Sequence, residues 1–257
     1  MTYSPEDSSI SSSAYDNAYY LESMEGADEF SLSDGRKLSR RLARAFNLAN
    51  IKPGQRVLDI GCGRGEVTYH SARLNASAHG LDYAQAAIEI ANELRRQAVE
   101  SGLHMYLERA ASSCLPYSND SFDVVFMLDV VEHLYPKDLV ATFLEVKRVL
   151  RSGGQLIVHT MPNSDYYLWG YPLFRALMKW RGKELPENPR LRWYRGETHV
   201  NIQNPRNLRK TLFTAGFSAV KVWLEPLNRS ALVRILLSIP PWRWFLINDI
   251  LGKATKL

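Results

Sequence analysis

Short apolar runs alternate with longer amphipathic stretches through the middle of the chain. Such alternation is typical of a parallel sheet whose strands are joined by crossover helices. The apolar runs predict strands over residues 56–60, 78–81, 104–107, 122–128, 155–160 and 217–223. Apolar residues three and four positions apart predict helices over 84–101, 139–150 and 205–215, each closed by a nearby glycine. The pattern therefore predicts a doubly wound α/β fold.

Outside this region the pattern changes. Residues 1–13 are polar and rich in serine, which predicts a disordered tail, and residues 14–52 are expected to form an N-terminal helical segment. The α/β core is expected to occupy 53–160 and to return in 201–257, with a short helix from Ser230 to Leu237. Residues 161–200 are rich in aromatic and basic side chains. Because a structureless loop of that length is unusual in a compact domain, we expect a helical cap insertion there.

Composition indicates the class of protein and the compartment in which it is expected. The chain has 257 residues, of which 46% are hydrophobic and 23% charged, as in ordinary globular proteins. Two cysteines without metal-ligand spacing and an acidic, serine-rich start predict a cytoplasmic protein without a secretory signal. The longest apolar stretch, 231–251, is interrupted by prolines and charges, so it is not expected to span a membrane.

The net charge of +5 is unevenly distributed along the chain. Residues 1–34 contain eight acidic and no basic residues, whereas residues 147–195 contain ten basic and three acidic residues. This polarity is compatible with an anionic substrate, a membrane surface or nucleic acid, and equally with an ordinary solvated surface.

A glycine-rich loop follows the first predicted strand. Glycines at 61, 63 and 65 allow a sharp turn and a close approach of a ligand to the backbone. Glu66 stands where a dinucleotide fingerprint requires its last glycine, and no Gly-Lys-Ser/Thr follows, as a P-loop requires. Because the acidic Asp59 and Glu66 would repel a phosphate, a ligand with a cationic amino group, a sulfonium and a ribose fits better. Asp82, at the end of the second strand, can accept hydrogen bonds from both hydroxyls of a ribose.

Together these motifs resemble the class I S-adenosylmethionine-dependent methyltransferases, and most closely the small-molecule branch that includes the quinone-biosynthesis enzymes. The resemblance extends from about residue 30 to 224. It implies a Rossmann-like sheet of seven strands, with the insertion as a helical, aromatic-rich cap, and S-adenosyl-L-methionine as cofactor. It rests on these motifs: Asp59-x-Gly61-x-Gly63-x-Gly65, Asp82, Leu115-Pro116-Tyr117, Ser121-Phe122-Asp123 and Arg151-x-Gly153-Gly154.

The resemblance also assigns cofactor contacts. Asp82 would bind the ribose and Tyr83 would lie beside the adenine. Family members commonly carry an acidic residue where this chain has Ala111, so Ser112 or backbone groups would replace it at the adenine. Asp129, after the fourth strand, would lie near the sulfonium and amino groups. The methionine end would be held by the start of the glycine loop, where Cys62 serves as a small residue in a tight turn: Asp59, Gly61, Cys62 and Gly63.

Three histidines are candidate catalytic residues, because methyl transfer to oxygen benefits from a base that titrates near neutral pH. His133 follows the fourth predicted strand, His159 ends the fifth, and His199 follows the insertion. The sequence does not decide which of them faces the acceptor. Asp129, Glu132 and His133 also reproduce an acid-x-x-Glu-His arrangement with which quinone-type enzymes can hold a divalent metal. Because magnesium prefers oxygen ligands to imidazole, we expect no metal here.

The acceptor is expected to be a small, partly apolar molecule. An aromatic cap over the active site would exclude water and line an apolar pocket, although aromatic residues at helical spacing are commonly structural. Basic residues of the insertion and the stretch 232–245 are compatible with peripheral membrane contact. The aromatic residues of the insertion are Tyr166, Tyr167, Trp169, Tyr171, Phe174, Trp180, Trp193 and Tyr194.

The sequence favours O-methylation and leaves C- and N-methylation open, as it does the oligomeric state. A nucleic-acid methyltransferase is disfavoured, because the chain has no recognised RNA-binding appendage and no Asn/Asp-Pro-Pro-aromatic motif after the fourth strand. A non-catalytic cofactor-binding protein is disfavoured by the intact glycines and by Asp59 and Asp82.

Overall fold

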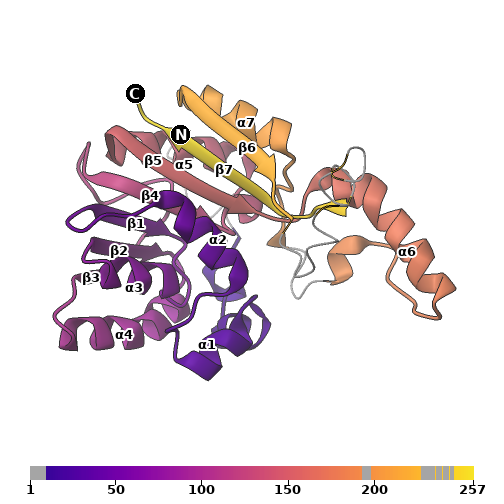
Figure 1. Cartoon of the computed structure of the whole chain (residues 1–257), viewed down its shortest axis with the longest axis horizontal. Coiled ribbons are helices and arrows are strands. Elements are labelled where there is room, and N and C mark those ends of the chain that lie inside the picture. The colour runs from indigo at the N-terminus through magenta and orange to yellow at the C-terminus, as the bar shows by residue number, and fades with distance from the viewer. Residues whose placement is uncertain (1–9, 193–197, 227–234, 236–238, 240–242, 244–245) are drawn as a thin grey trace.

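One sheet of seven strands organises the protein, as seen in a computed structural model that describes residues 10–192, 198–226 and, with gaps, 235–257. The strand order is β3-β2-β1-β4-β5-β7-β6, and only β7 runs antiparallel to its neighbours (Figure 1). The strands are β1 (Arg56–Ile60), β2 (Ser77–Asp82), β3 (Met105–Arg109), β4 (Phe122–Leu128), β5 (Leu150–Thr160), β6 (Ala219–Leu224) and β7 (Ile250–Thr255). The helices are α1 (Ala27–Ser33), α2 (Arg40–Ala49), α3 (Glu66–Arg73), α4 (Gln85–Glu100), α5 (Pro136–Val149), α6 (Tyr171–Trp180) and α7 (Pro205–Thr214).

Helices cover both faces of the sheet because alternate residues of each strand point to opposite sides. In β4, Val124 and Phe126 pack in the same core cluster as Leu42 of α2. Val125 and Met127, their neighbours in sequence, pack with residues of α5 and α7 on the other face. The central strands are buried on both sides, which explains why they read as continuous apolar runs rather than as alternating ones.

The carboxyl ends of β1, β2, β4 and β5 meet along one edge of the sheet, and the N-terminal segment lies over this edge (Figure 1). Residues 12–14 form a short 3-10 turn, and Tyr19–Ser23 form a π-helical turn ahead of α1. Tyr15 and Tyr20 of this segment are buried against Ala84 and Ala87 at the start of α4. The N-terminal segment is thus packed onto the core at the place where a ligand of this fold is expected.

The doubly wound α/β fold and the seven-stranded sheet are confirmed. The first and fourth strands have the predicted bounds, and the other predicted strands and helices differ at their ends by a few residues. Of the predicted disordered tail, residues 1–9 lie outside the described residues. Of the remaining residues, Ile10 packs against a hydrophobic cluster and Ser12 begins a short 3-10 turn. The expected helix from Ser230 to Leu237 and the stretch 232–245 lie mostly outside the described residues.

The insertion after β5 is helical, but α6 projects away from the sheet at one end of the molecule (Figure 1). β6 is the edge strand of the sheet, and β7, which follows it in sequence, lies between β5 and β6. The chain therefore turns back from the edge strand to a position next to β5. The sequence pattern assigned no residues to this last strand.

Candidate active site

A cavity of about 690 Å³ lies between the carboxyl edge of the sheet and the N-terminal segment. The sheet side contributes Gly61, Gly63, Asp82 and Asp129, and the N-terminal side contributes residues between Ile10 and Arg41. Its volume falls within the range of about 300–1,000 Å³ that is usual for small-molecule sites. The cavity is therefore large enough for a nucleoside-sized ligand.

The glycine loop turns sharply at the base of this cavity. The backbone N–H groups of Gly61 and Cys62 both donate to the Leu81 carbonyl, at 2.7 and 3.0 Å, which ties the loop to the end of β2. Gly61 has a φ of 70°, and a Cβ placed there would lie 2.3 Å from Cγ2 of Val130. A side chain is therefore excluded at Gly61 both by its backbone conformation and by its neighbour.

Asp82 faces the cavity and is almost fully buried. One carboxylate oxygen accepts a hydrogen bond from the Gly63 N–H at 3.0 Å, and the other accepts one from the Ala84 N–H at 2.9 Å. Burial raises the pKa of Asp82 to about 6, although both N–H groups favour its charged form. Each oxygen keeps further lone-pair capacity, so the carboxylate can also accept hydrogen bonds from two ligand hydroxyls.

Two residues expected at the cofactor do not line the cavity. Asp59 accepts a hydrogen bond from the Thr68 hydroxyl at 2.9 Å, on the far side of the loop, and burial raises its pKa to about 7. Cys62 is buried behind the loop, beside Gly80. Both side chains hold the loop against β2 and α3, so their contribution to a ligand is indirect. Gly61 and Gly63, by contrast, are part of the cavity wall.

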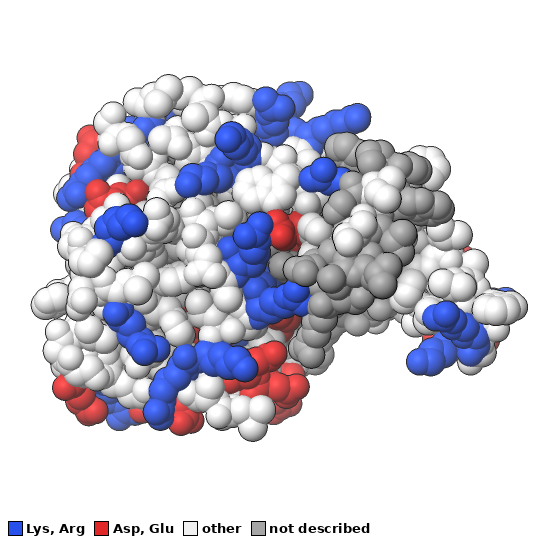
Figure 2. Space-filling model, viewed as in Figure 1, with Lys and Arg blue, Asp and Glu red and all other residues white. Residues whose placement is uncertain are grey.

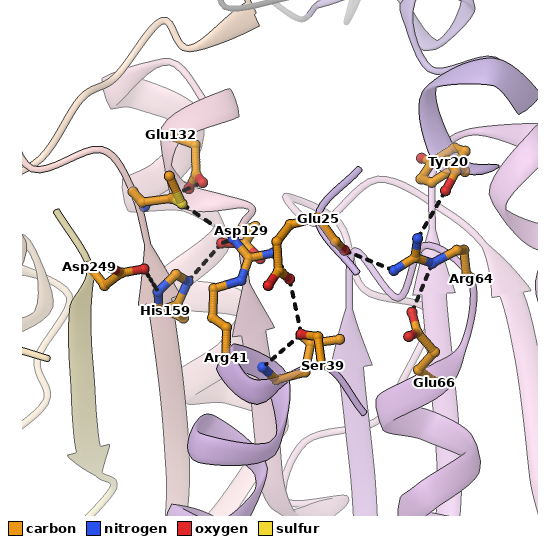
Figure 3. A network of polar contacts seen from close by, with 12 residues as sticks. Tyr20, Glu25, Ser39, Arg41, Arg64, Glu66, Asp129, Glu132, His159 and Asp249 are labelled. Carbon is orange, nitrogen blue, oxygen red and sulfur yellow. Dashed lines mark hydrogen bonds and ion pairs between the residues drawn. The ribbon is translucent and has the colours of Figure 1, made fainter. Parts of the chain in front are cut away.

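A network of charged side chains, all of them largely buried except Glu25, forms the wall beside Asp129 (Figure 3). The Arg41 guanidinium makes a two-pronged contact with the Asp129 carboxylate, at 3.0 and 2.9 Å, and a further ion pair with Glu25 at 3.0 Å. Burial works against the charge of Asp129, but Arg41 and His159 outweigh it and lower the pKa of Asp129. Arg41, Asp129 and Glu25 thus place one positive and two negative charges at the edge of the cavity.

Arg41 was not among the site residues predicted from the sequence. It lies in the first turn of an amphipathic helix, where a basic residue is ordinarily solvent-exposed, yet it is only 7% exposed and lines the cavity. No local signal distinguishes it from the neighbouring Arg40, because its carboxylate partners lie sixteen and eighty-eight positions away in the chain.

His159 differs from the expectation that it could act as a base. It does not line the cavity, and its two ring nitrogens contact Asp129 at 2.7 Å and Asp249 at 3.3 Å. Burial disfavours the charged ring, but the Asp129 carboxylate outweighs it and raises the pKa of His159 to about 9. His159 is therefore a protonated, buried partner of Asp129, and the geometry removes it from the candidate bases.

His133 and His199 lie together on the cavity wall, with ring centroids 5.0 Å apart. The Nδ1 of His133 lies 3.2 Å from the Thr198 carbonyl, which can only accept, so Nδ1 carries the proton and Nε2 holds a lone pair. Burial, aided by His199, lowers the pKa of His133 to about 4. His133 is therefore neutral at physiological pH.

Glu132 lines the cavity beside this histidine pair and accepts a hydrogen bond from the Thr160 hydroxyl at 2.7 Å. Burial and the nearby Asp129 raise its pKa. Ligand atoms of Glu132, His133 and His199 lie within 4.8 Å of one another, which makes them the metal-capable group among the described residues. The sequence-based set had Asp129 in the place of His199, but Asp129 is engaged with Arg41.

Aromatic side chains of the N-terminal segment form the outer wall. Tyr15 meets Tyr83 and His133 edge to face, at 5.6 Å in both cases, and Tyr19 packs against Tyr15. The insertion was expected to line this pocket, but of its described residues only Met161 and His199 do so. Tyr83 and Ser112, which the sequence placed beside the adenine, both line the cavity, and the Ser112 hydroxyl lies 2.9 Å from that of Thr142.

These groups fit the cofactor that the sequence motifs imply. Asp82 is suited to a ribose, the Arg41 guanidinium to a carboxylate, and the carboxylates of Glu25 and Asp129 to an ammonium group. The same wall does not suit a polyphosphate, because the carboxylates of Glu25 and Asp129 lie beside the Arg41 guanidinium and would repel phosphate groups.

Comparison with known proteins agrees with this fit. Residues 58–158 match the family model described as a methyltransferase domain. The chain is 28% identical over 190 residues to a ubiquinone biosynthesis O-methyltransferase of Bartonella bacilliformis, an alignment that covers 72% of this chain and 69% of the relative. A protein of the same name from Ruegeria sp. is 33% identical over 129 residues, which cover 49% of this chain and 50% of the relative.

Solved structures share the fold. Phosphoethanolamine N-methyltransferase 2 of Haemonchus contortus, solved with S-adenosyl-L-methionine, has a TM-score of 0.60 at 17% identity and covers 84% of this chain and 52% of its own. The YcgJ protein of Bacillus subtilis has a TM-score of 0.57 at 18% identity and covers 84% of this chain and 97% of its own. At sequence identities of 17% and 18%, these similarities establish the fold and no function.

Proposed function

We propose that this chain, which is a class I S-adenosyl-L-methionine-dependent methyltransferase, methylates a hydroxyl of a small, partly apolar acceptor. The observation that carries the proposal is His133, a neutral imidazole on the cavity wall with an unprotonated Nε2. Relatives named as O-methyltransferases support oxygen as the atom that is methylated.

The cofactor, when bound, supplies a methyl carbon that is activated by its positively charged sulfur. The chain supplies position and proton acceptance. Asp82, Arg41 and Asp129 hold the two ends of the cofactor site, and alignment of this kind can lower the barrier by several kcal/mol. His133 would take the acceptor's hydroxyl proton on Nε2 as the new oxygen–carbon bond forms and the sulfur–methyl bond of the cofactor breaks, which leaves a neutral thioether, while the Thr198 carbonyl holds the ring through Nδ1–H.

The wall around His133 indicates the class of acceptor. Tyr15, Tyr19 and Met161 present rings and a thioether there, and His199 adds a polar group beside the base. Such a lining suits a flat aromatic molecule with one or two ring hydroxyls, such as a catechol or a hydroquinone. This matches the substrate class that the names of the relatives indicate.

The test combines binding and product analysis. Purified protein is given S-adenosyl-L-methionine labelled in the methyl group together with catechol, hydroquinone or amine acceptors, and mass spectrometry locates the label. His133→Asn keeps a donor for the Thr198 carbonyl and should lower kcat by about 10²–10⁴-fold with unchanged affinity for S-adenosylhomocysteine. The matched control is His104→Asn, because His104 is exposed and lies outside the cavity.

Each other outcome has a meaning. Label on nitrogen or carbon refutes O-methylation, and an unchanged kcat in His133→Asn refutes the base. Activity that a chelator abolishes and a divalent cation restores would assign Glu132, His133 and His199 to a metal instead. Salt-dependent retention on RNA would favour a nucleic-acid acceptor. Cofactor binding without transfer to any acceptor would favour a non-catalytic role.

A second proposal concerns membrane contact and rests on α6. Four large apolar residues follow one face of this projecting helix and the turn before it: Trp169, Leu173, Leu177 and Trp180, which are 65%, 54%, 45% and 83% exposed. Basic side chains gather at the outer end of the same arm (Figure 2), where the sequence has Lys179, Arg181 and Lys183. Tryptophan beside basic residues is typical of helices that lie in a bilayer interface.

We therefore propose that α6 lies on an anionic membrane surface, where basic residues contribute roughly 1 kcal/mol each. No helix in the part of the chain that the structure describes is both long and apolar enough to cross a bilayer. Co-sedimentation with phosphatidylglycerol vesicles should fall in Leu173→Ser and Trp180→Ser, and should be weak with phosphatidylcholine. Leu144→Ser is the matched control, a helical leucine that is 51% exposed elsewhere. Concentration-dependent dimers without vesicle binding would instead assign the stripe to a second copy of the chain.

A further inference from the structure

Arg64 lies inside the glycine loop, yet its side chain is fully buried. Its Nε donates to the Glu66 carboxylate at 2.9 Å, and its guanidinium lies 4.9 Å from the centre of the Phe30 ring. The two remaining nitrogens donate to backbone carbonyls, NH1 to that of Tyr20 and NH2 to that of Glu25, both at 3.0 Å (Figure 3). All three nitrogens of the guanidinium are therefore used.

The two carbonyls lie near the two ends of one short segment. We call residues 19–25 the strap; it includes the π-helical turn Tyr19–Ser23. A guanidinium carries its donors in a rigid planar fork, so a single Arg64 can hold both ends of the strap at a fixed distance from the loop. A lysine at this position has one nitrogen and could not reach both carbonyls in the same way.

The strap is also a wall of the cavity. Tyr20, Ser23, Met24 and Glu25 line it, and a Cβ placed on Gly63 would lie 3.5 Å from both Tyr20 and Met24. The Glu25 side chain pairs with Arg41 across the cavity wall and accepts a hydrogen bond from the Ser39 hydroxyl at 2.9 Å. The strap thus faces the glycine loop at van der Waals distance, with the cofactor cavity between the strap and the sheet.

We propose that Arg64 is a positioning residue that fastens the strap to the glycine loop and thereby sets how fast the cofactor enters and leaves. The inference rests on the proposed function in one respect, the use of this cavity by S-adenosyl-L-methionine. In this proposal, a ligand held between strap and sheet is released faster when the strap parts from the loop. Breaking the two bonds from Arg64 to the Tyr20 and Glu25 carbonyls is part of that opening.

The first measurement uses the unaltered protein. Chymotrypsin cleaves after exposed tyrosines, so cleavage after Tyr19 and Tyr20 reports strap opening. S-Adenosylhomocysteine should slow cleavage at these sites at least tenfold more than cleavage at the outer arm, after Trp180. Equal protection at both places, or none, would overturn the proposal, and this reading requires no variant to fold.

The second measurement compares dissociation rates of S-adenosylhomocysteine by stopped flow. Arg64→Met removes all donors and should raise the dissociation rate about tenfold to a hundredfold, with a smaller change in the association rate. Arg64→Lys should lie between Arg64→Met and the wild type. Because Arg64→Met leaves Glu66 buried without its cation, the double variant Arg64→Met/Glu66→Met is measured beside it. Arg96→Met, on the exposed face of α4, is the control.

The outcomes separate this inference from the proposed function. Absence of S-adenosylhomocysteine binding to the wild type would contradict the cofactor assignment itself. Tight binding by the wild type with unchanged dissociation from folded Arg64→Met or the double variant would overturn the role of Arg64 alone. A merely structural role would lower thermal stability in Arg64→Met but leave strap protection by the ligand as large as in the wild type.

Discussion

The pKa values of two histidines are shifted in opposite directions in the two parts of the site. We call the part around the glycine loop, Asp82 and Asp129 the cofactor half, and the part around His133 and His199 the acceptor half. Behind Asp129, next to the part of the cavity wall where the cofactor is proposed to bind, His159 lies between Asp129 and Asp249, and its pKa is raised to about 9. In the acceptor half, His133 lies between the Thr198 carbonyl and the His199 ring, and its pKa is lowered to about 4. Both rings are withdrawn from bulk solvent, so burial disfavours the charged form of each.

The neighbouring groups therefore decide the protonation state of each histidine. As a result, the cofactor half is charged and the imidazole in the acceptor half is neutral. Paired charges in the cofactor half suit a zwitterionic ligand, which carries its own charges of both signs. The neutral imidazole of His133 keeps a lone pair on Nε2 that can accept a hydrogen bond or a proton from an acceptor hydroxyl, and its lowered pKa makes it a weaker base than an imidazole that titrates near neutral pH. A strand end and a short turn are enough to separate the two environments, since Asp129 and His133 are only four positions apart.

The largest effect is expected from removing the charge on which the cofactor half depends. Asp129→Asn keeps the shape and the positive φ of 58°, which asparagine tolerates, but leaves Arg41 and His159 without their shared carboxylate. We expect about 3–5 kcal/mol of lost unfolding free energy. Urea denaturation measures it.

A matched control exists on the surface. Asp34 also has a positive φ, 47°, and also pairs with an arginine, Arg36, but both side chains are largely exposed. Asp34→Asn should cost less than about 1 kcal/mol. Equal losses in the two variants would show that burial of the Asp129 network contributes nothing beyond local backbone preference.

The second prediction concerns the pH dependence of folding stability, to which His133 and His159 contribute in opposite directions. The pKa of His133 is depressed on folding, so its contribution to stability is present above pH 6.5 and is lost as the pH falls toward 4. The pKa of His159 is raised, so its contribution is present below pH 6.5 and is lost as the pH rises through 9. Each shift corresponds to an effect on the order of 3 kcal/mol.

Substituting each histidine separates the acidic range of this pH dependence from the basic range. The stability advantage of wild type over His133→Asn should shrink from pH 6.5 toward pH 4, whereas that over His159→Asn should shrink from pH 6.5 toward pH 9. Denaturant unfolding at these values measures both differences. Advantages that change in the same direction with pH would break the contrast between the halves.

The sequence predicted the cofactor half better than the acceptor half, for a physical reason. The glycine loop, Asp82 and Asp129 follow directly from strand ends, and the topology of a parallel sheet brings strand ends together. Arg41 and the aromatic residues Tyr15 and Tyr19 reach the cavity only because the N-terminal segment folds back over the sheet. That path depends on packing between distant parts of the chain, which no local pattern records.

The insertion shows the converse case. Its aromatic and basic composition was evident in the sequence, and its helical structure followed from its length. Its place did not, because period and composition do not state where a helix points. An amphipathic helix reads the same whether its apolar face covers a pocket or faces outward, as that of α6 does.

The smallest predicted effect concerns the seam between the two halves. Gly61 of the cofactor loop faces Val130, the residue between Asp129 and the turn that carries His133, and a Cβ there would lie 2.3 Å from Cγ2 of Val130. Gly61→Ala must also hold a left-handed φ, which costs an alanine about 1–2 kcal/mol. Gly153→Ala has a similar φ of 79° but open space around its Cβ, so it isolates the backbone cost. We expect equal backbone costs in the two variants, and an additional loss of about tenfold in affinity for S-adenosylhomocysteine in Gly61→Ala alone, measured by calorimetry. Unchanged affinity in Gly61→Ala would mean that Val130 yields freely and that the two halves are mechanically independent.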